Sequence, residues 1–288
     1  MQTARPDEGA VEAAIEHKGR SLTEDEQQDV HEHRKLRPLA VYEVIRREGV
    51  EELARPTASL WWSGLAAGLS IGFSVVTEGA LHIALPDTAW RPLVENLGYA
   101  VGFLIVILSR QQLFTEITLT AVLPVIYRPS RRKLMALARL WSVVFLANML
   151  GTALFAAACL SGVLLPEHIL EGMTAIAREL AELSPGQAFW RGILAGWMIA
   201  TLVWMLPSAE TGRSAIILLL TYLIALFELA HVVAGSMEVF LLLLDGEIGF
   251  GHGIGGLILP MLAGNVIGGS ALFALLAYGQ VRDEIEAE

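Results

Sequence analysis

The chain has few charged residues and almost no cysteine. Only 17% of its 288 residues are charged, whereas a soluble domain is nearer about a quarter charged. The single cysteine, Cys159, excludes an internal disulfide and a cysteine-rich metal site, and we expect no metal and no other cofactor. The formal net charge of −10 argues against nucleic acid as a partner.

Several patterns typical of other functional classes are also missing. The polar start of the chain has no short apolar core followed by a small-residue cleavage site, so we expect no secretory signal peptide. His-Glu-x-x-His and Gly-x-Ser-x-Gly are absent. Glu228-x-x-His231 has the spacing of a carboxylate metal site, but such bundles need a second copy, which the chain lacks. We therefore do not expect an enzyme.

Hydrophobic residues make up 54% of the chain, and after residue 57 they gather in runs near the ~20 residues that cross a bilayer. This pattern predicts an all-α membrane protein, because every backbone polar group needs a partner in lipid. We expect a polar tail that ends in an amphipathic helix, a six-helix transmembrane domain and a short second tail, at 1–57, 58–281 and 282–288. The expected spans are 59–82, 93–127, 135–164, 188–208, 214–244 and 253–280.

Two of these spans, the second and the fifth, are interrupted by polar residues. The breaks lie near 110–116 and 228–236. Irregular backbone at membrane depth is tolerated only where it is buried in protein or lines a cavity. Interrupted spans at corresponding positions of two halves indicate a substrate path.

Basic residues predict how the chain crosses the membrane. If the N-terminus is cytoplasmic, sixteen of the 20 Lys and Arg residues lie on the inner side, and only Arg91, Arg178 and Arg191 lie outside. Six spans then place both termini in the cytoplasm of a multi-pass protein, with membrane lipid around it.

The two halves also repeat short motifs in the same order. The segment that begins at Trp62 matches the one at Trp190, and the segment at Asn148 matches the one at Asn265. Three spans per copy is an odd number, so the two copies must have opposite topology. The sequence therefore predicts two inverted three-helix repeats.

These motifs resemble the formate/nitrite transporter family over roughly 38–281. The broken second helix keeps the family core Leu113-Phe114-Thr115, and the broken fifth helix keeps the histidine of His231-Val-Val-Ala-Gly-Ser. The sixth-helix Gly-Asn-x-x-Gly-Gly is intact at 264–269. The Arg-Gln-Gln-Leu-Phe-Thr version is similar to a divergent inner-membrane branch of this family.

The resemblance implies an aquaporin-like protomer, a homopentamer with one pore in each subunit, and a location in the bacterial inner membrane. It also implies a substrate path and proton relay whose central residue is His231, with Thr115 close enough to bond the ring. Histidine changes charge near physiological pH, so an entering anion would favour its protonation. The other residues implied on this path are Leu113 and Phe114 at the constriction and Asn265 near the pore.

Three charged residues at the breaks are candidates for selectivity. Arg110 keeps its charge at any relevant pH. It attracts anions at the pore, pairs with Glu116, or extends its charge to water at the cytoplasmic end of the break. Glu228 lies one turn before His231 and either replaces a neighbouring acidic residue of the family or caps the broken helix.

We therefore expect a channel or transporter for small monovalent anions, of the formate or nitrite kind and proton-linked through His231. One alternative is a neutral-solute channel of aquaporin type, although neither repeat carries Asn-Pro-Ala: the chain has Asn148-Met-Leu and Asn265-Val-Ile. Another is a non-conducting membrane scaffold that uses the polar tail.

Overall fold

The computed structural model describes residues 36–209 and 211–286. Most of the predicted polar tail, residues 1–35, lies outside the described residues, as do 210, 287 and 288. All regular elements within the described residues are helices. Five of them are long and apolar enough to cross a membrane, by length and composition alone: Thr57–Ala84, Arg91–Leu108, Arg131–Leu160, Pro185–Ser208 and Gly251–Ile285.

The first repeat contains one whole helix, one broken helix and a second whole helix. Its elements are α4 (Thr57–Ala84), α5 (Arg91–Glu95), α6 (Ala100–Leu108), α7 (Phe114–Thr120), α8 (Leu123–Tyr127) and α9 (Arg131–Leu160). The break predicted in the second span therefore separates α6 from α7. Ser130 begins α9 as its N-cap, because its side chain accepts a hydrogen bond from the Lys133 amide.

The second repeat follows the same order. Its elements are α11 (Pro185–Met205), η1 (Leu206–Ser208), α12 (Arg213–Leu226), α13 (Val232–Asp245), η2 (Gly251–Ile258), α14 (Leu259–Val266), η3 (Ile267–Ala274) and α15 (Leu275–Glu286). The second break separates α12 from α13. The sixth span is one continuous helical segment, but η2 and η3 are π-helical, a form that is often found at functional sites.

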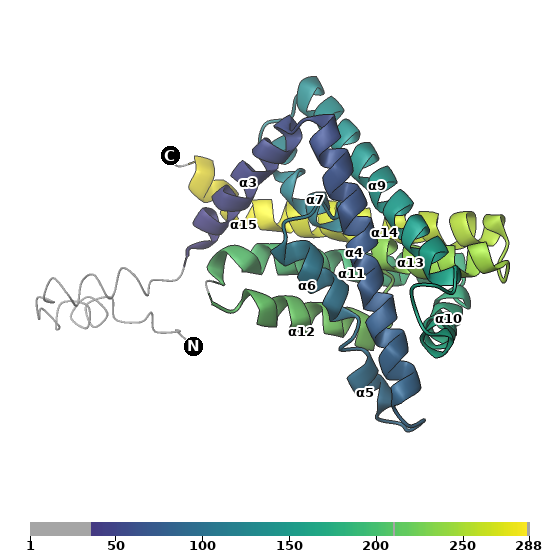
Figure 1. Cartoon of the computed structure of the whole chain (residues 1–288). Coiled ribbons are helices and arrows are strands. Elements are labelled where there is room, and N and C mark those ends of the chain that lie inside the picture. Colours follow the sequence, from purple (N-terminus) through teal and green to yellow (C-terminus); the bar gives the residue numbers. More distant parts are fainter. Residues whose placement is uncertain (1–35, 210, 287–288) are drawn as a thin grey trace, which may run out of the picture. The chain divides into compact units, whose positions relative to one another are not determined.

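Two helices flank the six spans. Helix α3 (Pro38–Ala54) occupies the range predicted for the amphipathic helix and buries Val41, Tyr42 and Ile45 against the bundle, where it contacts α8 and α15. Helix α10 (Glu167–Ala181) lies in the connection between the repeats and was not predicted. It packs against α4 and α13. In Figure 1, α3 lies near the N-terminal end of α4, and α5 and α10 lie near its other end.

The second half of each broken helix packs against the other repeat. Helix α7 contacts α11 and η3, while α13 contacts α9 and α4. The first halves, α6 and α12, contact each other. This exchange brings the two breaks together inside the bundle.

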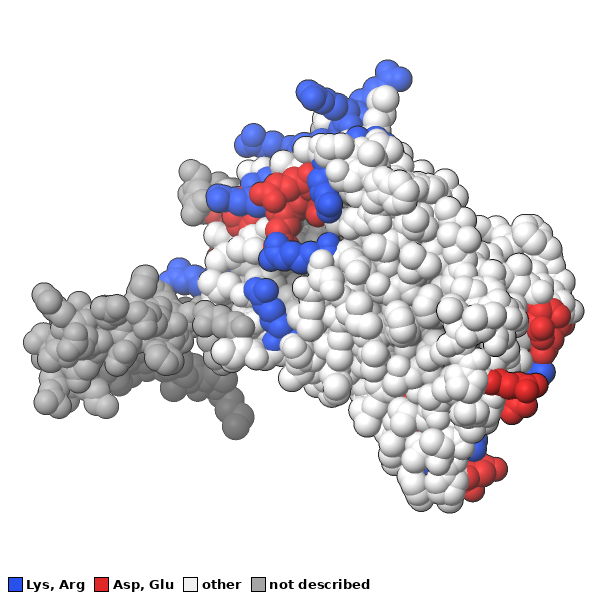
Figure 2. All heavy atoms as spheres, viewed as in Figure 1, with Lys and Arg blue, Asp and Glu red and all other residues white. Residues whose placement is uncertain are grey.

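Charged side chains gather at the two ends of the bundle. On the face drawn in Figure 2, Lys and Arg lie mainly along the upper and left edges, and Asp and Glu dominate the lower right end. The surface between them is almost free of charge. Such an uncharged band is what lipid contact requires.

Equivalent glycines allow the whole helices of each repeat to approach closely. A methyl group at Gly68 would lie 2.3 Å from the Asn148 carbonyl oxygen, and one at Gly196 would lie 2.3 Å from the Asn265 carbonyl oxygen. Both obstacles are backbone atoms, which cannot move aside independently of their helices. The motif matches seen in the sequence therefore mark the α4–α9 and α11–α14 contacts.

We expect Gly196→Ala to lower the stability of the detergent-solubilised protein by about 1–3 kcal/mol, the usual effect of overpacking a tight contact. Gly186→Ala is the matched control, because nothing lies within 4 Å of a methyl group there. Thermal unfolding of the two variants measures the difference. Equal midpoints would contradict the close contact between α11 and α14.

Candidate functional site

The two breaks have the same backbone geometry. Arg110 and Glu228 are the only described non-glycine residues with positive φ, at 54° and 51°. After α6, the amides of Arg110 and Gln111 donate to the carbonyls of Ile107 and Val106. This pair of bonds is a Schellman motif, which satisfies the last carbonyls of a helix.

The second break repeats this pattern. After α12, the amides of Glu228 and Leu229 donate to the carbonyls of Ala225 and Ile224. Left-handed backbone is unfavourable for residues other than glycine and tends to be found at functional sites. Arg110 and Glu228 are thus equivalent residues of opposite charge, each at the end of a first half-helix.

One asparagine holds each break in place. Asn148 of α9 accepts a hydrogen bond from the Phe114 amide at 2.9 Å and donates to the carbonyls of Gly64 and Gln112 at 2.7 and 2.9 Å. These bonds connect the start of α7, the end of the break and α4. Asn148 is completely buried, so its amide replaces the solvent that these backbone groups would otherwise need.

Asn265 of α14 does the same in the second repeat. It accepts from the Val232 amide and donates to the carbonyls of Gly192 and Ala230, all at 2.8 Å. Both of its N–H groups are used, and it is not among the residues that line the cavity described below. The structure therefore places Asn265 behind the break, where it holds the backbone.

His231 is the N-cap of α13, and it occupies the position that Leu113 occupies before α7. Its Nδ1 accepts a hydrogen bond from the Ala234 amide at 3.2 Å. Its Nε2 lies 2.7 Å from the Thr115 hydroxyl oxygen. The side chain is almost completely buried, so one residue from each break meets the other at the centre of the bundle.

These contacts define the tautomer of the ring. Because Nδ1 accepts from an amide, the neutral ring carries its proton on Nε2. Nε2 then donates to the Thr115 hydroxyl oxygen. The hydrogen atom of the Thr115 hydroxyl has no acceptor among the described residues, so it remains available to donate to another group.

Aromatic and aliphatic side chains surround the pair. The Phe103 ring meets the His231 ring edge to face, with centroids 4.9 Å apart. Leu113 is completely buried. The Phe114 ring points toward α9, where it lies 5.2 Å from the ring of Phe145, so its contact is with a neighbouring helix.

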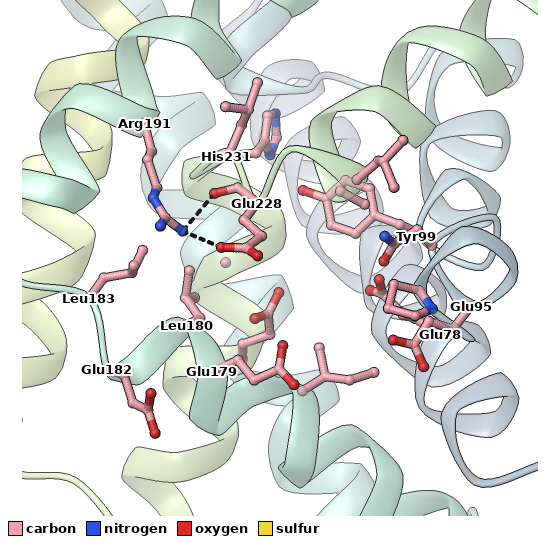
Figure 3. A pocket seen from close by; sticks show the side chains of 18 of the residues that line it. Glu78, Glu95, Tyr99, Glu179, Leu180, Glu182, Leu183, Arg191, Glu228 and His231 are labelled. Atoms are coloured by element: carbon pink, nitrogen blue, oxygen red, sulfur yellow. Dashed lines mark hydrogen bonds and ion pairs between the residues drawn. The ribbon is translucent and has the colours of Figure 1, made fainter. Parts of the chain in front are cut away.

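A cavity of about 520 Å³ leads to His231 from the end of the bundle that carries α5 and α10. We call this cavity the vestibule. Figure 3 shows Arg191 and Glu228 on one side of it, Glu78 and Tyr99 on the other, and His231 beyond Glu228. The charged residues that line it are Glu78, Arg91, Glu95, Glu179, Glu182, Arg191, Glu228 and Glu238.

Salt bridges use both arginines of the vestibule. Arg191 contacts the Glu228 carboxylate at 2.9 Å, and it also donates to the Glu228 carbonyl. Arg91 lies 3.3 Å from the Glu95 carboxylate, which also contacts His82 at 3.1 Å. Glu228 therefore neither bonds His231 nor caps α13, because Arg191 holds it at the edge of the vestibule.

Arg110 and Glu116 lie toward the opposite end of the bundle, beneath α3. Arg110 is exposed, and no salt bridge joins it to Glu116 within the described part of the chain. It interacts instead with Glu48 of α3: burial raises the pKa of Glu48, and the charge of Arg110 opposes that shift. The proposed Arg110–Glu116 pair is thus not formed.

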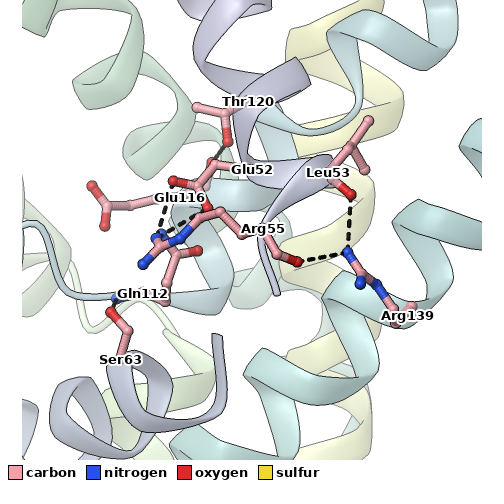
Figure 4. Close-up of polar contacts among 8 residues, drawn as sticks. All are labelled: Glu52, Leu53, Arg55, Ser63, Gln112, Glu116, Thr120 and Arg139. Atoms are coloured by element: carbon pink, nitrogen blue, oxygen red, sulfur yellow. Dashed lines mark hydrogen bonds and ion pairs between the residues drawn. The ribbon is translucent and has the colours of Figure 1, made fainter. Parts of the chain in front are cut away.

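The C-terminal end of α3 is fixed beside this break. Arg139 of α9 donates to the carbonyls of Leu53 and Arg55 at 2.9 and 3.0 Å, as Figure 4 shows. Glu52 and Glu116 lie near Arg55 in the same view. Bonds to the last carbonyls of a helix from a cation are favourable, so α3 is held against the bundle here.

Sequence reasoning missed several residues of the vestibule. Glu78 and Tyr99 carried no motif, and Arg191 was counted only for the orientation of the chain. Glu78 did have a signal, because a carboxyl within an otherwise apolar span is costly and marks a candidate site.

Comparisons with known proteins agree with this architecture. The formate/nitrite transporter family matches residues 39–279. The chain is 39% identical over 279 residues to "Inner membrane protein YfdC" of Escherichia coli (strain K12), covering 97% of this chain and 88% of that one. It is 31% identical over 192 residues to "Formate channel FocA" of Haemophilus influenzae, covering 62% of this chain and 66% of that one.

A solved structure described as "Pentameric formate channel with formate bound" superposes with a TM-score of 0.69 at 20% sequence identity, covering 78% of this chain and 97% of that one. This likeness confirms the predicted aquaporin-like, all-helical fold. Members of the matched family are transport channels and not enzymes. From the family match and its relatives, the chain belongs to the formate/nitrite transporter family.

Proposed function

We propose that the chain carries small monovalent weak-acid anions, of the formate and nitrite kind, across the bacterial inner membrane. The observation that carries this proposal is the buried His231–Thr115 hydrogen bond, which joins the two breaks at the inner end of the vestibule. The relative named as a formate channel supports the substrate class, and the relative named as an inner membrane protein supports the location.

We further propose that transport is linked to a proton through His231. In the neutral ring, Nδ1 is occupied by the Ala234 amide, so a second proton can bind only when the ring leaves this cap. An anion beside Thr115 would favour the charged ring. The Nε2 proton would then pass to the Thr115 oxygen while the hydroxyl proton moves to the anion. The neutral acid crosses the apolar constriction. The ring is then neutral with its proton on Nδ1, and it resumes the resting form when Nδ1 releases this proton to water and Nε2 takes one up, so that Nδ1 again accepts from the Ala234 amide.

The remaining residues would shape the path and select the ions that enter it. Leu113 provides the apolar part of the constriction that excludes hydrated ions. Phe114 and Asn265 keep the breaks in position through their contacts with α9 and the backbone. Glu228 lies at the mouth of the vestibule.

On the other side, exposed Arg110 offers its charge to anions at the α3 end, where Glu116 lies near Glu48 and Glu52. Selection at this end would thus come from one cation among several carboxyls.

We also propose that α3 and both termini face the cytoplasm and that five copies assemble, each with its own path. The basic first turn of α9, with Arg131, Arg132 and Lys133, lies at the α3 end, as the positive-inside rule requires. Exposed Trp62 and Trp190 occupy equivalent positions on α4 and α11 and suit contact with lipid or a neighbouring subunit. The pentameric title of the solved relative supports the number of copies.

Thr115→Val tests this proposal, because valine has a similar shape but no hydroxyl. We expect formate flux into liposomes to fall about tenfold or more, since a hydrogen bond to a charged group contributes about 1.5–3 kcal/mol. Thr115→Ser keeps the hydroxyl and should retain most of the flux. If Thr115→Val transports formate as fast as the unmodified chain, Thr115 does not contact the substrate.

A further inference from the structure

The vestibule is far more acidic than a path for anions requires. Six glutamates and two arginines line it. Both arginines are already engaged, with Glu95 and Glu228. A free anion that enters this cavity therefore meets uncompensated carboxylates, unless some of them carry protons.

Two of the unpaired glutamates are buried. Glu78 of α4 is 5% exposed and Glu238 of α13 is 7% exposed, and both line the vestibule. Neither carboxyl group has a hydrogen bond or salt bridge to any residue in the described part of the chain. The other two, Glu179 and Glu182, are exposed near the mouth. Buried carboxyls without partners at membrane depth are rare and typically belong to substrate or proton paths.

The position of Glu238 connects it with His231. Both residues are on α13, two turns apart, which is about 10 Å along the helix axis. Gly235 lies between them and also lines the vestibule; it contributes no side chain of its own, and the side chains of Leu180 and Met261 lie beside it. A distance of this size is too long for a direct hydrogen bond between the Glu238 carboxyl and the His231 ring. A proton can cross it through a short chain of water molecules.

Glu78 faces the same space from α4. It is close enough to Glu238 for the two carboxyls to interact electrostatically, and both act on Tyr99. The Tyr99 and Phe103 rings lie 5.2 Å apart, and Phe103 contacts His231. The paired carboxyls and the histidine thus border one continuous cavity.

A metal site is not supported by this arrangement. Among residues 36–209 and 211–286, no group of three or more His, Cys, Asp or Glu side chains could hold a metal ion.

Several titratable or charged groups surround Glu78 and Glu238. From all elements around the cavity, these are His82, Arg91, Glu95, Tyr99, Glu179, Glu182, Arg191, Glu228 and His231. Of these, only His231 is a buried imidazole without a charged partner.

We propose that Glu78 and Glu238 form a proton-loading pair that supplies His231 from the vestibule side. A carboxylic acid of the pair gives its proton through water in the cavity to Nδ1 of His231, which has left the Ala234 amide. The carboxylate that remains takes a new proton from the solution at the mouth. This inference rests on the proposed function, because it names the source of the proton that accompanies the anion.

Glu78→Gln and Glu238→Gln test the pair in the full-length chain reconstituted in liposomes. Formate uptake and the accompanying change in internal pH are recorded together from pH 5 to 8. We expect both variants to lose about tenfold or more of their uptake toward pH 8, because a positioned proton donor contributes about 10²–10⁴-fold to a proton-transfer step. Glu171→Gln, which alters an exposed carboxyl of α10 outside the lining of the vestibule, should behave as the unmodified chain.

Glu238→Asp keeps a titratable carboxyl, and it should restore part of the uptake that Glu238→Gln loses. Thermal unfolding identifies any variant that fails to fold. If the glutamine variants are folded and keep the pH profile of the unmodified chain, the pair does not load protons, although the proposed function stands. If the unmodified chain moves no formate at any pH, the proposed function falls and takes this inference with it.

Discussion

Replacing His231 by alanine should abolish most formate transport, with a loss of about tenfold or more for the hydrogen bond to a charged group and a further loss for the missing proton donor. The change removes the 2.7 Å hydrogen bond to Thr115, which joins a side chain of one break to a side chain of the other at the end of the vestibule. Flux into liposomes, compared with the unmodified chain at matched protein content, measures it.

His231→Ala also removes the N-cap of α13, which costs about 0.5–2 kcal/mol of stability. His231→Asn separates the two effects, because an asparagine oxygen can still accept from the Ala234 amide. We expect the asparagine variant to be nearly as stable as the unmodified chain and as inactive as the alanine variant. An active, stable asparagine variant would show that the histidine serves only as a cap.

Replacing Asn265 by alanine should have the largest effect on stability. It leaves the Val232 amide and the carbonyls of Gly192 and Ala230 buried without partners, and each such group costs about 1–3 kcal/mol. We expect the variant to unfold at a much lower temperature in detergent or to fail to accumulate in the membrane. Thermal unfolding and the yield of membrane-inserted protein measure this loss.

The inverted repeat provides an internal check on that expectation. Asn148→Ala removes the equivalent three bonds and should destabilise the protein by a similar amount. Asn96→Ala is the control, since the Asn96 side chain bonds no described residue. Equal stability of all three variants would mean that the breaks do not depend on their asparagines.

The sequence was sufficient to predict the fold for a physical reason. Lipid forces each apolar run into a helix, and small residues at fixed positions mark where helices touch. The close approaches at Gly68 and Gly196 therefore follow from motifs in the chain. The two breaks were also visible, because polar residues interrupt runs that are otherwise apolar.

Side-chain pairing within the site could not be predicted in the same way. Arg110 and Glu116 are near each other in the chain, but no salt bridge joins them among the described residues, and the charge of Arg110 acts instead on Glu48 of α3. Arg191 and Glu228 are far apart in sequence and form a salt bridge. The spacing of residues along one helix cannot predict a contact with a residue on another helix.

The asparagines illustrate a second limit. Their equivalence was visible, and a hydrogen bond between helices was the expected role. The sequence could not predict that each asparagine side chain bonds three backbone groups at once, because these bonds depend on where the break ends in space. Helix α10 was missed because its other face carries charged residues, including Arg178, which pairs with Glu247, so its apolar residues form no run long enough to resemble a span.

The most direct test of the central claim counts the protons that accompany each formate ion through the unmodified chain and through His231→Asn. Liposomes that contain a pH-sensitive dye and radiolabelled formate give both numbers from one preparation. We predict close to one proton for each formate in the unmodified chain, and almost no movement of either in His231→Asn. Rapid formate flux without protons, or equal flux in the two proteins, would contradict transport through the His231–Thr115 site.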